Sequence, residues 1–324
     1  MLGVFAHPDD ETVCAGGTLA KYASEGAEVH VVSLTKGGAG QIRDARVATR
    51  ATLEAGLGDI VTPRADDPLD ERDPAFIDAT LDVYDGLLQP YFRPKVRGLE
   101  NIPDGPVLLV GNHSGGTLIA DTFIFAYAFI KHFGSERPFH QLVHDAAINL
   151  PVLARGVRKY GGMPASPKNA ERALKSGAAV LVYPGGDYET YRPSWHQDRI
   201  EFGDRRGFLR LARRTGVPIV PVVSIGGQET ALFLTRGRRL AKATGWDRLT
   251  RIKVAPFQIA PPFGLTFLDL PTRIPLPAQI TIQVLPPIDL DDIDGKPAYK
   301  HVTGVMQDAL DELAEERSAI PLVG

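Results

Sequence analysis

The chain has 324 residues, of which 44% are hydrophobic and 23% charged, and its formal net charge at pH 7 is -3. This length is enough for one large core, or for a large domain beside a small one, and the charge gives no polybasic signal for a nucleic-acid partner. The single cysteine, Cys14, excludes an internal disulfide and fits a reducing compartment. No run of about 18 apolar residues and no secretory pattern is visible, so we expect a cytoplasmic protein without a spanning helix.

The first sixty residues predict alternating strands and helices. Four segments carry these patterns, namely residues 2–6, 17–24, 27–34 and 43–56. The first strand runs directly into His7, Asp9 and Asp10. Imidazole and carboxylate groups at a strand end suit Zn²⁺, and a neighbouring carboxylate can deprotonate a bound water.

This segment resembles the zinc-dependent N-acetylglucosaminyl deacetylases of the LmbE/PIG-L type. The resemblance is carried by Ala6-His7-Pro8-Asp9-Asp10-Glu11 and by residues 35–41, and it covers only residues 2–58. It implies zinc ligands at His7 and Asp10 and a general base at Asp9. The third ligand of that family comes from a His-x-Asp-His motif, which this sequence lacks. Because catalytic zinc sites keep three protein ligands, we favour a small βαβα fragment (residues 1–58) without metal over a working deacetylase.

The acidic, proline-containing residues 59–74 predict a linker, and residues 75–324 predict one α/β domain. A stripe of apolar side chains predicts a helix over residues 74–92, which packs in the core or, with the basic residues after it, docks at a membrane interface. Residues 107–110 are wholly apolar and bounded by turns, which is typical of a buried strand. Residues 117–133 are strongly apolar and predict a buried helix or a monotopic element, because they are too short to span a bilayer.

Downstream, apolar strands and amphipathic helices alternate. We expect strands over residues 178–183, 218–224 and 280–284, and helices over residues 169–176, 205–215 and 301–315. This alternation indicates an α/β fold whose parallel-rich sheet is covered by helices on both faces. His113 follows the buried strand in Asn112-His113-Ser114-Gly115-Gly116, and Asp121 comes one short segment later. Open α/β sheets place ligands and chemistry at such strand ends.

Several motifs in order resemble the PlsC-like glycerolipid acyltransferases, which move an acyl group from acyl-CoA or acyl carrier protein to a lipid hydroxyl. The motifs are residues 96–103, Asn112-His113-Ser114-Gly115-Gly116, residues 161–166, Tyr183-Pro184-Gly185-Gly186 and residues 217–222. The resemblance runs from Asp73 to Ile288. It implies a glycerolipid acyltransferase-like fold and an O-acyltransferase without a cofactor.

The same resemblance implies roles for individual residues. His113 would abstract the acceptor's hydroxyl proton, and Asp121 would hold the imidazole ring. Backbone N–H groups or other fixed donors near the glycine loops would meet the oxyanion. The residues implied in substrate binding are Asn112, Ser114, Gly115, Gly116, Pro184, Gly185, Gly186, Asp187 and Glu189.

Two positions depart from the family pattern. The family's Asp lies five residues after its His, whereas Leu118 stands there and Asp121 lies eight residues on. Tyr188 stands where the phosphatidic-acid branch has an Arg that meets the acceptor phosphate. A cationic side chain suits phosphate, so its absence favours an uncharged acceptor, although Arg192, Lys168 or Arg205 could supply the charge.

A basic segment precedes an apolar, proline-rich one near residue 260. The cations are Arg236, Arg238, Arg239, Lys242, Arg248, Arg251 and Lys253, and the apolar stretch is residues 261–268. This pairing suits an anionic membrane surface, so we expect peripheral attachment to a membrane through this patch. A solvated helix beside a packed loop explains the pattern equally well. The zinc deacetylase and a catalytically inactive lipid-binding relative stay open as alternative functions.

Overall fold

The computed structural model describes residues 2–5, 30–33, 67–117, 119–144, 148, 151–244, 253–267, 269, 273–290 and 295–317. Contacts divide the chain into two units, residues 1–66 with 150–155 and residues 67–149 with 156–324. In the first unit β1 (Leu2–Phe5) and β2 (His30–Ser33) pair in parallel, as the strand patterns predict. The helices expected over residues 17–24 and 43–56 lie outside the described residues.

The second unit is built around a seven-stranded sheet with the order β3-β12-β8-β4-β7-β5-β6. Its strands are β3 (Lys95–Arg97), β4 (Val107–Gly111), β5 (Phe139–Val143), β6 (Gly162–Pro164), β7 (Ala179–Val182), β8 (Ile219–Ile225) and β12 (Thr281–Val284). Every neighbouring pair is parallel except β12 with β8. The predicted parallel-rich α/β sheet is confirmed.

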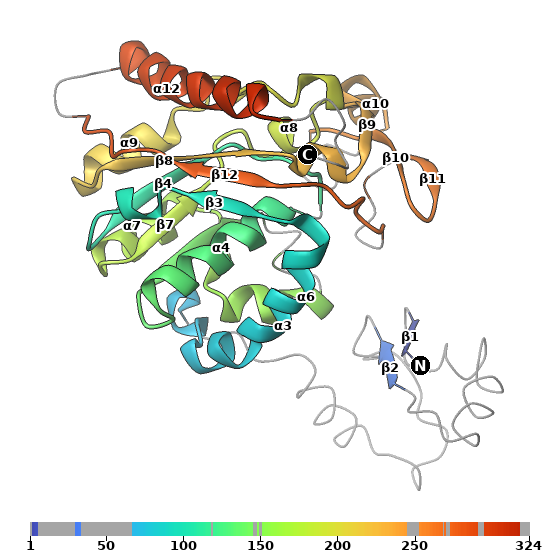
Figure 1. The fold of residues 1–324 in the computed structure, drawn as a ribbon, viewed down its shortest axis with the longest axis horizontal. Helices are drawn as coiled ribbons and strands as arrows, with labels where there is room; N and C mark the ends of the chain where they lie inside the picture. The colour runs from blue at the N-terminus through green and yellow to red at the C-terminus, as the bar shows by residue number, and fades with distance from the viewer. Residues whose placement is uncertain are drawn as a thin grey trace, which may run out of the picture. The chain divides into compact units, whose positions relative to one another are not determined.

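Helices cover both faces of this sheet (Figure 1). The faces are covered by α3 (Pro74–Phe92), α4 (Ala120–Phe133), α7 (Pro167–Lys175), α9 (Gly207–Thr215) and α12 (Gly295–Glu315). The other described helices are α6 (Pro151–Lys159), α8 (Gly186–Thr190) and α10 (Arg238–Ala243). Short 3₁₀ turns are η1 (Pro68–Glu71), η2 (Leu99–Asn101), η3 (Ser194–His196) and η4 (Gly227–Thr230). None of the described helices combines the length and apolar character that crossing a bilayer requires.

The central strand β4 is buried on both faces, which explains its uninterrupted apolar sequence. Leu108 and Val110 join the core formed with α7, α9 and α12. Val107 and Leu109 point the other way and join the core formed with α3 and α4. The period of two along a strand therefore divides one apolar run between two cores.

Local capping sets where several helices begin and end. α3 occupies the predicted residues 74–92, because Asp73 accepts from the N–H of Phe76 and Pro74 suits the first turn. α7 begins at Pro167, two residues earlier than expected, because Ser166 caps it by accepting from the N–H of Asn169. α9 ends where Gly216 adopts a left-handed conformation with φ of 66°.

Three expected boundaries need correction. The helix expected from residue 117 begins at Ala120, because the preceding residues form the loop after β4. α12 begins at Gly295 instead of residue 301, since a proline is tolerated in a first helical turn. Residues 67–73, which the sequence assigns to the linker, form η1 and its caps, and Glu71 forms an ion pair with Arg158 at 2.8 Å.

A second, small sheet adjoins the loop after β4. It has the order β11-β10-β9, and its strands are β9 (Leu232–Thr235), β10 (Phe257–Ala260) and β11 (Gly264–Phe267). Both pairings are antiparallel. The expected apolar stretch over residues 261–268 thus contributes the turn and the second strand of a hairpin.

Candidate active site

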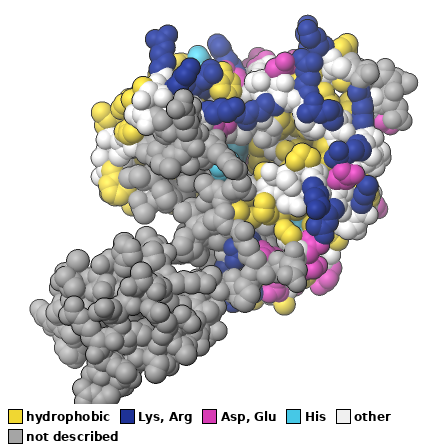
Figure 2. Space-filling view, turned by 180° about the vertical axis from the view of Figure 1, so that it is seen from behind, with side chains coloured by type: hydrophobic (Ala, Val, Ile, Leu, Met, Phe, Trp, Pro, Cys, Tyr) yellow, Lys and Arg dark blue, Asp and Glu magenta, His cyan; other side chains and the backbone are white. Residues whose placement is uncertain are grey.

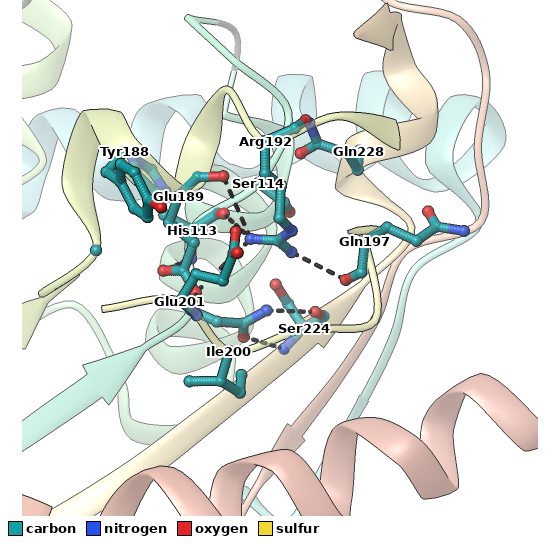
Figure 3. A network of polar contacts seen from close by, with 12 residues as sticks. His113, Ser114, Tyr188, Glu189, Arg192, Gln197, Ile200, Glu201, Ser224 and Gln228 are labelled. Atoms are coloured by element: carbon teal, nitrogen blue, oxygen red, sulfur yellow. Dashed lines mark hydrogen bonds and ion pairs between the residues drawn. The ribbon is translucent and has the colours of Figure 1, made fainter. Parts of the chain in front are cut away.

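The site forms where three neighbouring parallel strands end. β4 lies between β8 and β7 and pairs in parallel with each, so the segments that follow them meet at one edge of the sheet. These segments are residues 112–117, 183–190 and 226–231. Figure 3 shows the polar side chains that link them. This edge is where open α/β sheets bind ligands.

Asn112 fixes the start of the loop after β4. Its Nδ2 donates to the carbonyl of Ser224 at 2.8 Å, and its Oδ1 accepts from the N–H of Ser224 at 2.7 Å. The side chain, with only 1% of the residue exposed, thereby continues the hydrogen bonding of β4 with β8. The structure gives Asn112 a role in holding the loop, whereas the sequence placed it among the residues that contact substrate.

His113 is held through both its ring and its backbone. The imidazole stacks on the ring of Tyr183, with 4.2 Å between ring centroids and 13° between planes. Its N–H donates to Oε2 of Glu189 at 2.9 Å, and its carbonyl accepts from Nη1 of Arg192 at 2.8 Å. The ring's Nδ1 is buried and hydrogen-bonds to no described residue. The backbone of this residue is therefore fixed by two hydrogen bonds, and its ring is held by stacking.

The surroundings of His113 keep its ring neutral. Burial lowers the pKa of His113, the Asp121 carboxylate opposes that shift, and the Arg192 cation adds to it. A ring with a lowered pKa is unprotonated near pH 7. This is the form that accepts a proton from a hydroxyl group.

Asp121 lies in the first turn of α4 and is 1% exposed. Its Oδ2 accepts from Oγ of Ser114 at 2.8 Å and from Oγ of Ser224 at 3.2 Å, and its Oδ1 accepts from the N–H of Thr122 at 2.7 Å. The described residues include no hydrogen bond between this carboxylate and the His113 ring. The structure brings Asp121 to the loop as expected, and its proposed task of orienting His113 stays a prediction.

Gly115 and Gly116 form the extra turn that separates His113 from Asp121. Both have left-handed backbones, with φ of 87° and 66°, and a Cβ on Gly116 would lie 2.1 Å from Oδ2 of Asp269. The N–H of Gly115 donates to Oε1 of Gln228 at 3.2 Å, and that of Gly116 donates to the carbonyl of Thr190 at 3.2 Å. The sequence suggested backbone N–H groups of the glycine loop as donors to the oxyanion. These two N–H groups already donate to acceptors within the protein.

The loop after β7 is held from outside by Arg205. Nη1 of Arg205 donates to the carbonyls of Gly185 at 2.7 Å and Pro184 at 3.3 Å, and its Nη2 pairs with Oδ1 of Asp187 at 2.9 Å. Gly186 has a left-handed backbone with φ of 47°, which turns the chain into α8. A Cβ on Gly185 would lie 2.3 Å from Oε2 of Glu189, so glycine is needed where the loop passes this side chain.

Glu189 connects three segments of the site from a fully buried position in α8. Its two carboxylate oxygens accept from the N–H groups of His113 at 2.9 Å and Glu201 at 3.0 Å. Nη1 of Arg192 lies 3.7 Å from Oε1. Burial raises the pKa of Glu189 to about 7, against the opposing effects of Arg192 and of the bond from His113. The expected contact of Glu189 with substrate stays a prediction, and the structure adds a role in supporting the backbone of His113.

Arg192 is the largest fully buried side chain among the described residues. It lies between His113 and Gln197, whose carbonyl accepts from its Nη2 at 3.0 Å (Figure 3). Its Nε is buried and has no hydrogen-bond partner among the described residues. The sequence offered Arg192 only as a possible partner for a phosphate, because nothing local indicates that its guanidinium bridges two loops.

Sequence reasoning missed several residues that support the site. Tyr183, Ser224 and Gln228 contact the loop directly. Tyr183 stood in a quoted motif without a role, and Ser224 gave a signal as a polar residue at the end of an apolar strand, whereas Gln228 gave none. Asp269 and Arg273 form a buried ion pair at 2.7 Å, and Asp269 also accepts from the N–H of Thr117. Because both residues lie far from His113 along the chain, the sequence gave no indication that they contact its loop.

The candidate zinc ligands, His7 and Asp10, and the base position Asp9 lie outside the described residues. A zinc site there stays an expectation from the sequence.

Comparison with known proteins agrees with both resemblances. The "Acyltransferase" family model matches residues 93–225, and the "GlcNAc-PI de-N-acetylase" model matches residues 2–62. An uncharacterized protein of Mycobacterium tuberculosis is 34% identical over 208 residues, which cover 64% of this chain and 57% of that protein. This chain therefore spans little more than half the length of that relative.

Two further proteins are similar. Phytyl ester synthase 1 of Arabidopsis thaliana is 31% identical over 143 residues, covering 42% of this chain and 20% of the synthase. The crystal structure of the 1-acyl-sn-glycerophosphate acyltransferase PlsC from Thermotoga maritima matches with a TM-score of 0.45 and 18% identity, over 81% of this chain and 88% of that one.

Proposed function

We propose that this chain, in which residues 93–225 form a domain of the acyltransferase family, transfers an acyl group from a thioester donor to the hydroxyl of a lipid, with His113 as general base. One observation carries the proposal. A neutral imidazole stands at the carboxyl end of the central strand, with its backbone fixed by Glu189 and Arg192 and with the charge of Asp121 acting on its ring. Such a group is suited to removing a proton from an alcohol.

The proposed step needs no covalent enzyme intermediate. The acceptor's hydroxyl oxygen attacks the thioester carbon while His113 takes its proton, and a C–O bond forms. The tetrahedral intermediate then collapses, the C–S bond breaks, and the leaving thiolate takes the proton back from the imidazolium. Asp121, whose charge raises the pKa of His113, stabilises the imidazolium between these events.

A donor for the oxyanion has to come from a group that the fold leaves available. The N–H groups of His113, Gly115 and Gly116 all donate to protein acceptors. Nε of Arg192 is a buried donor without a described partner. We therefore propose this guanidinium N–H as a fixed donor near the reacting carbonyl, where preorganised donors stabilise developing charge.

The structure supports an uncharged acceptor. Tyr188 occupies the position at which a phosphate-binding Arg was expected, and its ring lies beneath Arg236, with 4.2 Å between guanidinium carbon and ring centroid. Three cations were offered by the sequence instead. Arg192 binds carbonyls within the site, Arg205 pairs with Asp187, and Lys168 lies exposed in the first turn of α7. The name of the plant relative, a phytyl ester synthase, also refers to the ester of a neutral alcohol. A diacylglycerol or a long-chain alcohol is the acceptor class we propose.

The test is acyl transfer by the full chain, with radiolabelled acyl-CoA and acyl carrier protein as alternative donors. Acceptors are diacylglycerol, a long-chain isoprenoid alcohol and a monoacylglycerol phosphate. We expect transfer to the neutral acceptors, and a loss of about 10²–10⁴-fold in kcat in His113→Ala. His132→Ala, which removes an exposed histidine of α4, is the matched control and should keep full activity.

Two results would overturn the proposal. Undiminished transfer by His113→Ala would remove His113 as the base, and transfer to the phosphate-bearing acceptor alone would remove the neutral acceptor. Release of acetate from an N-acetylglucosaminyl compound, abolished by a chelator, would instead assign the activity to residues 2–62.

A further inference from the structure

The small sheet β11-β10-β9 has one face buried against the active-site loop. Phe233, Gln258 and Ala260 point to this face and are 0%, 1% and 3% exposed. Nε2 of Gln258 donates to Oδ1 of Asp269 at 2.7 Å, and Asp269 accepts from the N–H of Thr117. The sheet is thus tied by hydrogen bonds to the loop that carries His113.

The opposite face of the sheet is apolar and exposed. Ile259 lies directly across from Leu232 on one side and Leu265 on the other, so that the three form a row across all strands. They are 43% (Leu232), 41% (Ile259) and 63% (Leu265) exposed. Beside this row, the rings of the cross-strand pair Phe257 and Phe267 contact each other at a tilt of 46°, with 5.4 Å between their centroids.

Exposed apolar side chains are concentrated here. Among the described residues, the large hydrophobic side chains with high exposure are Trp195, Leu232, Ile259, Phe263, Leu265, Phe267 and Ile274. All except Trp195 lie on this sheet, on its turn, or on a segment bound to it, since the N–H of Ile274 donates to the carbonyl of Pro261. An antiparallel sheet with one buried face normally presents polar residues on the other. A concentrated apolar patch of this kind marks an interaction surface.

Basic residues flank the apolar face. α10 follows β9 directly, carries Arg238, Arg239 and Lys242 on exposed positions, and contains no acidic residue. Lys253, ahead of β10, is also exposed. Figure 2 shows hydrophobic side chains at the edge of the molecule where β10 and β11 lie, with Lys and Arg side chains next to them. Arg236, which the sequence included in this cluster, instead pairs with Glu201.

We propose that this apolar face is a docking surface for an anionic phospholipid bilayer. Leu232, Ile259 and Leu265 enter the interfacial region, and the α10 cations contact the headgroups. The inference rests on the proposed function in one respect, namely that the acceptor is a lipid drawn from that bilayer. Through Gln258 and Asp269, the docked sheet holds the His113 loop next to the membrane surface from which the acceptor arrives.

Charge favours a bilayer over a second copy of the chain. A two-fold contact through this face would set the cations of two α10 helices against each other, because such a contact uses the same patch on both copies. An anionic surface complements these cations and accepts the apolar row at the same time. A membrane therefore satisfies both features of the surface.

The experiment is vesicle flotation of the full chain, with phosphatidylcholine vesicles that contain or lack phosphatidylglycerol. We expect binding that is stronger with the anionic lipid. Ile259→Thr combined with Leu265→Thr keeps strand propensity and should weaken binding roughly tenfold or more. Arg239→Gln combined with Lys242→Gln should weaken binding only to anionic vesicles, by about fivefold for each cation.

Two controls make the assay specific. Arg210→Gln removes an exposed cation of α9 and should change nothing. With Trp195 and Trp246 replaced by phenylalanine, a tryptophan placed by Leu265→Trp should be quenched by brominated lipids, and one placed by Arg210→Trp should not. Circular dichroism and the unfolding midpoint establish that each variant is folded.

The outcomes separate this surface from the proposed reaction. Absence of vesicle binding by the wild type, or equal binding by the Ile259/Leu265 variant, overturns the docking surface. A dimer that this variant abolishes, without vesicle binding, overturns it in favour of a second copy. Vesicle binding without acyl transfer would support the docking surface and refute the proposed reaction. Transfer to a detergent-dispersed alcohol without vesicle binding would support the reaction and refute the docking surface.

Discussion

Replacing Glu189 by glutamine tests the electrostatics of the site, because two opposing effects act on this carboxylate. It is fully buried, which disfavours its charge, and Arg192 and two backbone N–H groups favour the charge. The effect of burial is the larger, since the pKa of Glu189 is raised from an ordinary 4.5 to about 7. The glutamine variant keeps the size of the side chain and removes its titration.

The sign and size of the effect follow from that pKa. Between pH 4.5 and 7 the folded chain holds a proton on Glu189 that the unfolded chain has released. The free energy of unfolding therefore falls as the pH rises through this range, at about 1.4 kcal/mol per pH unit. Between pH 5 and pH 8 the wild type should lose about 2–3 kcal/mol through this group, and Glu189→Gln should lose none of it.

The assay is urea unfolding of both proteins at pH 5 and pH 8. All other titrating groups are the same in the two proteins, so their effects cancel in the difference between the two free energies of unfolding. This difference, wild type minus Glu189→Gln, is the stability advantage of the wild type and should be about 2–3 kcal/mol smaller at pH 8 than at pH 5. Asp187→Asn, in the same helix α8, is the control, and its advantage should not shrink, because the pKa of Asp187 is lowered beside Arg205. An advantage that stays constant or grows with pH would mean that the Arg192 ion pair outweighs burial, and the reasoning would be refuted.

Three further predictions concern the loop after β4. In the wild type, the rate should hold down to pH 6.5 and fall below it, because burial lowers the pKa of His113; a pH–rate profile checks this, and a decline that starts above pH 7 would contradict it. Asn112→Ala should cost about 1–3 kcal/mol of unfolding free energy, because it leaves the buried N–H and carbonyl of Ser224 unpaired; chemical denaturation measures it. Gly111→Ala would place a Cβ 2.5 Å from Cε1 of Tyr183, so it should displace the ring that stacks on His113 and lower kcat more than it changes KM, which steady-state kinetics can separate.

The sequence predicted the elements whose signals are local. An uninterrupted apolar run predicted β4, and a stripe of apolar side chains predicted α3. The alternation of strands and helices predicted the parallel-rich sheet, which the pairings confirm. Boundaries shifted where a cap or a turn acted over a few residues, as at Ser166 before α7 and at the glycines before α4.

For the site, the sequence predicted which residues take part but not which atoms they contact. His113, Asp121 and Glu189 were identified from their places in motifs at strand ends, and the fold brings all three into one region. What each side chain contacts could not be read from the motifs. Asp121 was expected to hold the His113 ring, which stays a prediction, and the structure adds hydrogen bonds to Ser114, Ser224 and Thr122 that no motif indicated.

Only the tertiary structure decided these partners, and the reason lies in the order of strands across the sheet. β8 and β7 flank β4, although long segments of chain separate the three, and this order sets Ser224 beside Asn112 and Glu189 beside His113. The tertiary structure likewise decides that Phe233 and Gln258 are buried while Leu232 and Ile259 are exposed. The sequence does not indicate which of these side chains face the core. Hydrophobic periodicity specifies which elements form, because it acts between near neighbours; the hydrogen bonds of a buried site form between loops that only the assembled sheet brings together.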